Sequence, residues 1–106
     1  MDHLDEALRG ISDPIRRRIL TLLRDKELAA GAIAEEFEVT RPAISHHLRV
    51  LRESGLVAER RNGQNRMYSA NREGIEVLKE WFHSFFPIDD HDTESGVRGA
   101  DRELGT

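Results

Sequence analysis

The chain has no cysteine among its 106 residues. Disulfides, thiolate metal ligands and cysteine nucleophiles are therefore excluded, and with them several classes of enzyme. Aromatic residues make up only 6% of the chain. No stretch approaches the roughly 18 to 20 consecutive apolar residues that a membrane-spanning helix requires, and residues 1–6 are acidic rather than signal-like. We therefore expect a cytoplasmic protein with no membrane partner.

The chain also lacks a positive net charge, since its formal charge at pH 7 is -4. Residues 87–106 contain six acidic and two basic residues, which accounts for the whole of this charge. Because this segment is also poor in large apolar side chains, we expect it to be a disordered acidic tail. Residues 1–86 are expected to form one domain. Within them, residues 41–66 contain six arginines and two glutamates, so positive charge is concentrated in one stretch.

Apolar residues at helical spacing predict five helices. The first three are expected over residues 3–11, from Pro14 to about Arg24, and over about residues 29–36. Asp13 and Thr40 are suited to cap the second and fourth helices, because each precedes a proline within the first turn. Gly55 is expected to end the fourth helix in a left-handed conformation. Asn71 is expected to cap the fifth.

The fourth helix has two distinct faces in this pattern. Ile44, Leu48 and Leu51 point inward, whereas the opposite face is polar and basic and carries Arg41, Ser45, His46, Arg49 and Arg52. After it, residues 56–61 and 65–69 have strand character, and the pair Asn62-Gly63 between them is typical of a tight hairpin.

Two short helices joined by a tight turn, followed by an arginine-rich hairpin, are the parts of a winged helix-turn-helix. The predicted fold is therefore mainly α with a small β-hairpin, in the order of four helices, two strands and a last helix. Such a helix fits the major groove of DNA, and wing arginines reach phosphate or the minor groove. The candidate base-edge contacts are Thr40, Arg41, Ser45 and His46. The candidate phosphate contacts are Arg49, Arg60, Arg61 and Arg66, and the hairpin tip adds Asn62, Gln64 and Asn65.

Three stretches carry a resemblance to a known family: SDPIRRRILTLL (residues 12–23), RPAISHHLRVLRESGLV (residues 41–57) and RRNGQNRMY (residues 60–68). In this order and spacing the chain resembles the ArsR family of repressors, over about residues 4–86. The resemblance implies that His47 joins Ser45 and His46 in DNA contact. It also implies a dimer interface on the first and last helices, where we expect Leu4, Leu8, Leu78, Trp81, Phe82 and Phe85.

Two departures from the family pattern bear on function. Many relatives have arginine at the position of His46, so base preference is expected to differ there, and His47 is equally well explained as a packed, hydrogen-bonded histidine. Soft-metal sensors of the family resemble one another in a C-x-C pair at the start of the third helix, where this chain has Ala29 and Gly31. Thiolate sensing is therefore excluded.

No cofactor or metal is expected. Glu80 and His83 could offer two metal ligands, but a tetrahedral site needs more, and Asp89, Asp90 and His91 would contribute only if the tail folded back. The acidic residues are too scattered to suggest a catalytic group, so the chain is not expected to be an enzyme. The aromatic residues of the last helix are assigned to the dimer rather than to an effector pocket.

We expect a homodimeric repressor that binds double-stranded DNA at an inverted-repeat operator. The sequence is compatible with two alternatives. One is a winged-helix module that binds a protein without reading DNA sequence. The other is an activator of the same fold, which differs only in where its site lies relative to the promoter.

Overall fold

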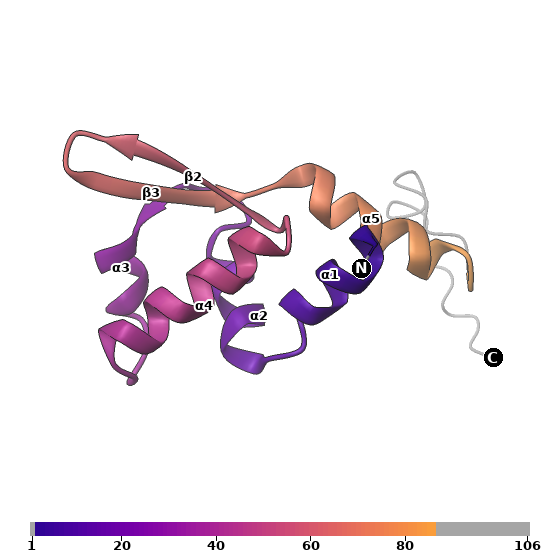
Figure 1. Cartoon of the computed structure of the whole chain (residues 1–106), viewed down its shortest axis with the longest axis horizontal. Coiled ribbons are helices and arrows are strands. Elements are labelled where there is room, and N and C mark those ends of the chain that lie inside the picture. The colour runs from indigo at the N-terminus through magenta and orange to yellow at the C-terminus, as the bar shows by residue number, and fades with distance from the viewer. Residues whose placement is uncertain (1, 87–106) are drawn as a thin grey trace, which may run out of the picture.

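The structure, a computed structural model, describes residues 2–86. Its elements, in chain order, are α1 His3–Gly10, α2 Pro14–Leu22, β1 Leu28–Ala29, α3 Ala30–Ala34, α4 Arg41–Glu53, β2 Val57–Asn62, β3 Asn65–Ala70 and α5 Arg72–His83 (Figure 1). The predicted winged helix-turn-helix is confirmed. The predicted acidic tail, residues 87–106, lies outside the described residues.

Two predicted helix caps are present. The carboxylate of Asp13 accepts from the backbone N–H groups of Ile15 and Arg16 at 2.8 and 3.1 Å, and Pro14 occupies the first turn of α2. The hydroxyl of Thr40 accepts from the N–H of Ala43 at 3.2 Å. Each cap satisfies N–H groups that the start of a helix leaves without an intrahelical partner.

The prediction that the Asn71 side chain caps α5 is wrong. Asn71 stands at the N-cap position but makes no side-chain cap bond. Its Nδ2 instead donates to the carbonyl oxygen of Gly55 at 2.8 Å. Gly55 itself has φ +79°, as predicted for the residue that ends α4. The Asn71 side chain therefore ties the start of α5 to the turn after α4.

The sheet has three strands in the order β1-β3-β2, both pairs antiparallel. The hairpin of β2 and β3 was predicted, but β1 was not, because two residues are too few to show a strand pattern. The turn was expected at Asn62 and Gly63, but Asn62 lies in β2 opposite Asn65. Gly63 and Gln64 therefore form the two-residue loop. Gly63 has a positive φ of +67°, whereas Gln64 has no positive φ. A positive φ at the first loop residue alone is the pattern of a type II′ turn.

A single hydrophobic core joins α1, α2, α3, α4 and α5 with β2 and β3. Its fully buried side chains are Ile19, Leu23, Ile33, Ile44, Leu48, Leu51 and Leu56. The predicted inward stripe of α4 is confirmed, since three of these residues come from it. Figure 1 shows α1 beside α5 at one end of the molecule and the hairpin projecting over α3 at the other. Core packing thus leaves the outer face of α4 and the hairpin free to form a surface.

Candidate nucleic-acid interface

The outer face of α4 is polar and accessible. Arg41, Ser45, His46 and Arg49 are all exposed. Nη2 of Arg49 lies 3.4 Å from Nδ1 of His46, so these neighbouring side chains contact each other. Thr40 is exposed as well, but its hydroxyl already accepts the capping bond from Ala43. The structure therefore brings together on one face the candidates for base contact from the first two turns of the helix.

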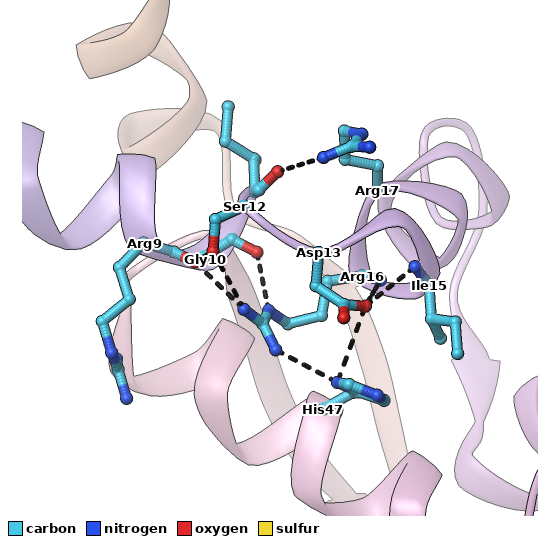
Figure 2. Close-up of polar contacts among 9 residues, drawn as sticks. Arg9, Gly10, Ser12, Asp13, Ile15, Arg16, Arg17 and His47 are labelled. Carbon is cyan, nitrogen blue, oxygen red and sulfur yellow. Dashed lines mark hydrogen bonds and ion pairs between the residues drawn. The ribbon is translucent and has the colours of Figure 1, made fainter.

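His47 lies apart from this face. Its side chain is 14% exposed and points toward the start of α2. Nη1 of Arg16 lies 3.1 Å from its Nδ1, and Oδ2 of Asp13 lies 4.0 Å from the same atom (Figure 2). Burial lowers the pKa of His47 below its ordinary value, and Arg16 and His46 add to this effect although Asp13 opposes it. The structure thus favours the packed, hydrogen-bonded alternative for His47.

The two faces of the hairpin carry different arginines. Arg61 lies directly opposite Arg66, so both side chains are on one face of the hairpin. Glu59 is on the same face, two residues before Arg61. Arg60 is on the other face, where Glu27 holds it in a two-point ion pair. Arg60 therefore points to the opposite face of the hairpin from Arg61 and Arg66. From the sequence, all three were predicted to contact phosphate.

A cleft of about 470 Å³ separates α4 from the wing. The wing side of its lining includes Gln64, Asn65 and Arg66. Its four arginines are Arg41, Arg49, Arg52 and Arg66. Of the carboxylates in residues 2–86, Glu59 is the one that lines it. The cleft is therefore cationic and polar, which suits the sugar-phosphate backbone of a nucleic acid.

Glu59 links the two walls of this cleft. Its Oε1 lies 3.5 Å from Nε of Arg52 on α4, and its Oε2 lies 3.4 Å from Nε of Arg66 on β3. Sequence reasoning did not identify this carboxylate or Glu27 as part of the site. The Glu27–Arg60 pair joins residues 33 positions apart, so no local pattern could have indicated it.

Three arginines of the basic stretch keep their charge uncompensated. Within residues 2–86, no ion pair involves Arg41, Arg49 or Arg61. Arg52, Arg60 and Arg66 each have a carboxylate partner. The positive charge available to a polyanion is thus centred on the start and middle of α4 and on the end of β2.

A second accessible surface lies at the far end of the molecule. Trp81 and Phe82 of α5 are 37% and 41% exposed, and Phe85 just after it is 64% exposed. The ring of Trp81 meets those of Phe82 and Phe85 edge to face, at centroid distances of 5.2 and 5.1 Å. Leu78, which was expected at a subunit interface, instead belongs to the core and is 8% exposed.

The first helix completes this end of the molecule. Leu4 and Leu8 of α1 are half-buried and pack against the core.

The part of the chain that the structure describes brings no three histidine or acidic side chains together as a metal site. Asp89, Asp90 and His91, which would add ligands only if the tail folded back, lie outside the described residues. No helix of that part is long and apolar enough to cross a membrane.

Comparison with known proteins gives a consistent result. Residues 13–59 match the family described as "Bacterial regulatory protein, arsR family". The chain is 37% identical over 89 residues to the transcriptional repressor SdpR of Bacillus subtilis, an alignment that covers 84% of this chain and 99% of SdpR. It is 38% identical over 77 residues to the arsenical resistance operon repressor of Staphylococcus xylosus, covering 73% of this chain and 74% of the relative.

A similar fold is present in solved structures. One of them, described as a possible transcriptional regulator for arsenical resistance, shares 37% identity with this chain and has a TM-score of 0.71. The match covers 89% of this chain and 97% of the other. The match therefore extends over most of the length of both chains.

Proposed function

The chain belongs to the arsR family of bacterial regulatory proteins, and on that premise we propose that it represses transcription as a homodimer bound to an inverted-repeat operator. Its family and relatives are DNA-binding transcriptional regulators rather than enzymes. Its place of action is then the cytoplasm, where bacterial DNA lies.

The observation that carries this proposal is the exposed polar face of α4 beside three uncompensated arginines. Ser45 and His46 are exposed on the helix that a helix-turn-helix inserts into the major groove, so they are positioned to read base edges. Arg41 and Arg49 flank them, and Arg61 stands on the wing. Two subunits then present about six guanidinium groups to phosphate. A protein with six phosphate contacts loses about 10³ in affinity between 50 and 200 mM salt.

The dimer is proposed from the second surface. Trp81, Phe82 and Phe85 form an exposed aromatic cluster at the end of α5, the helix that packs against α1. Clusters of this kind mark subunit interfaces more often than open surface. Pairing of two copies would place their recognition helices in successive major grooves about 34 to 36 Å apart. One small module makes few base contacts, so doubling them is what converts weak attraction into operator selectivity.

Repression is supported by two relatives that are named as repressors, SdpR and the arsenical resistance operon repressor. The similarity to the arsenical resistance operon repressor does not imply arsenic sensing by this chain, because the chain has no cysteine to bind a soft metal. An effector, if the protein has one, therefore acts through other chemistry.

The test is selection of bound duplexes from a random DNA pool with purified protein. We expect enrichment of an inverted repeat whose half-sites are about 10 base pairs apart, centre to centre. The selection is repeated with zinc, with nickel and with a chelator, and the mass of the free protein is measured by sedimentation. A monomer at micromolar concentration that enriches no palindrome would contradict the proposal.

A further inference from the structure

The guanidinium of Arg16 joins the end of α1 to the middle of α4. Nε donates to the carbonyl oxygen of Gly10 at 2.8 Å, and Nη2 reaches the carbonyl oxygen of Arg9 at 3.1 Å and the hydroxyl of Ser12 at 3.3 Å. Nη1 lies 3.1 Å from Nδ1 of His47 (Figure 2). Because a guanidinium is planar and rigid, these bonds hold the two helices in one relative position.

The bond to His47 also defines the state of the imidazole. Arginine has donors but no acceptor, so Nδ1 of His47 must accept the bond and must carry no proton. The ring is then neutral with its proton on Nε2. Asp13, whose carboxylate lies 4.0 Å from Nδ1, caps α2 through the N–H groups of Ile15 and Arg16. The same short segment therefore caps α2 and contacts α4.

A second contact attaches α1 to α4 at another point. A Cβ on Gly10 would lie 2.6 Å from Cδ1 of Leu56 and 2.9 Å from Cβ of Ser54, so the end of α1 packs directly on the residues that follow α4. Ser54 and His47 are seven residues apart, which is about 10 Å along a helix. One contact alone would leave a pivot, whereas two contacts about 10 Å apart fix the direction of α4 relative to α1.

We propose that Arg16 is a positioning residue that fixes the direction of the recognition helix relative to α1 and thereby sets the separation of the two recognition helices in the dimer. The statement about separation rests on the proposed function, because it requires α1 to lie at the subunit interface. The statement about direction concerns one subunit and does not require a partner or DNA.

Arg17 provides a matched control. Its Nη1 donates to the carbonyl oxygen of Ile11 at 2.7 Å, so it too binds the end of α1 from the first turn of α2. No hydrogen bond or ion pair of the described chain joins it to α4. Arg16→Lys and Arg17→Lys each keep the positive charge. Only Arg16→Lys removes a guanidinium that contacts α4.

The first measurement is a distance between spin labels within one subunit. Since the chain has no cysteine, Asp5→Cys on α1 and Arg41→Cys at the start of α4 give a unique label pair. Labelled protein is diluted with unlabelled protein so that intersubunit distances are suppressed. We expect Arg16→Lys to broaden the distance distribution and Arg17→Lys to leave it as in the parent. A distribution that is unchanged by Arg16→Lys would overturn the inference.

The second measurement uses the duplex enriched by selection, together with versions that have one base pair inserted or removed between the half-sites. We expect the unsubstituted protein and Arg17→Lys to prefer the selected spacing. The preference should fall by about fivefold or more in Arg16→Lys, the lower end of typical coupling between two sites. Affinity for a single half-site should stay within about twofold.

The outcomes separate the two proposals. If the label distances broaden but no palindrome is enriched, the proposed function fails while the positioning role of Arg16 stands. If a palindrome is enriched and Arg16→Lys retains the full spacing preference, Arg16 does not set the separation. A merely destabilising substitution would lower half-site and full-site affinities together and would leave the spacing preference intact.

Discussion

Arg60 and Glu27 form a two-point ion pair in which Nε and Nη2 of the guanidinium lie 2.7 and 2.6 Å from the two carboxylate oxygens. The pair spans the sheet, because Arg60 is on β2, Glu27 precedes β1, and β3 lies between these strands. The hydrogen bond from Arg60 also holds the pKa of Glu27 below its ordinary value. The carboxylate is therefore charged at any pH where DNA binding would be measured, and it competes with phosphate for Arg60.

Substitution of Glu27 by glutamine should increase general DNA affinity. It removes the negative charge that faces Arg60 and leaves this arginine free for phosphate. We expect the slope of log affinity against log salt to change from about -5 to about -7 for the dimer, because each phosphate contact contributes about -0.9. Glu73→Gln removes the same charge from the first turn of α5 and should change the slope little. Identical slopes for Glu27→Gln and the parent would show that Arg60 remains unavailable.

Arg61 and Ser45 should affect binding in different ways. Arg61→Ala removes an uncompensated charge, so it should weaken binding on all sequences and reduce the salt slope by about 1 per subunit. Ser45→Ala and His46→Ala alter the face proposed to read bases, so they should change which bases are preferred, by about 1 to 3 kcal/mol at one position. Binding to a panel of single-base operator variants tests this. Uniform losses on every duplex for Ser45→Ala and His46→Ala would refute their assignment to base reading.

Gly74→Ala should strongly destabilise the fold. A Cβ at Gly74 would overlap the carbonyl oxygen of Gly55, and neither backbone can yield without moving α5 from the turn. We expect a loss of about 3 kcal/mol, the upper part of the range for overpacking. Gly31→Ala is the control, because the nearest atom to its Cβ is Nη1 of Arg41 at 3.9 Å, and a helical Gly-to-Ala change should add about 0.5 to 1 kcal/mol. Urea unfolding at one protein concentration measures both.

Phe85→Ser should weaken the proposed dimer. The ring is 64% exposed in the single subunit and contacts Trp81, so burial between subunits would stabilise the dimer. We expect the dissociation constant of the dimer to rise about tenfold or more, equivalent to about 1.4 kcal/mol. Sedimentation equilibrium gives this constant. Val39→Ser removes an exposed apolar side chain from the turn before α4 and should leave it unchanged; an equal effect of both substitutions would argue against a specific interface.

The thermal midpoint should fall as the pH decreases below about 6.5. Burial lowers the pKa of His47 in the folded state, so the unfolded chain takes up a proton first, and the contribution of the neutral ring is lost between 6.5 and the folded pKa. His47→Gln cannot titrate, although its amide oxygen can still accept from Arg16. The difference in midpoint between pH 7.5 and pH 5.5 should therefore be smaller in His47→Gln. Equal differences in the two proteins would exclude His47 as the source.

Local chemistry made most of the fold predictable. The caps at Asp13 and Thr40, the stripe through Ile44 and Leu48, and the glycine at 55 depend only on residues within a turn of one another. β1 escaped prediction because its two residues become a strand only by pairing with Met67 and Tyr68 of β3. The Asn71 side chain escaped for the same reason, since its acceptor lies 16 residues away.

The candidate site was predictable in outline but not in its charge pairing. Arg52, Arg60 and Arg66 look equivalent to Arg61 in sequence, and only the folded arrangement shows which of them meet a carboxylate. His47 presents a similar case. It follows His46 by one residue, a rotation of about 100° around the helix. That rotation places it at the border of the outer face, where contact with Arg16 decides its orientation.

The shortness of β1 has a mechanical consequence for the wing. β1 pairs with Met67 and Tyr68, so within residues 2–86 the hairpin beyond them is a ribbon of two strands with no third neighbour. Such a ribbon bends at low energetic cost, because few interstrand bonds resist it. Its tip can follow duplexes of different curvature and groove width while the anchored end stays in register. Tolerance of DNA shape would then come from the wing, and discrimination between sequences from the stiffer helix beside it.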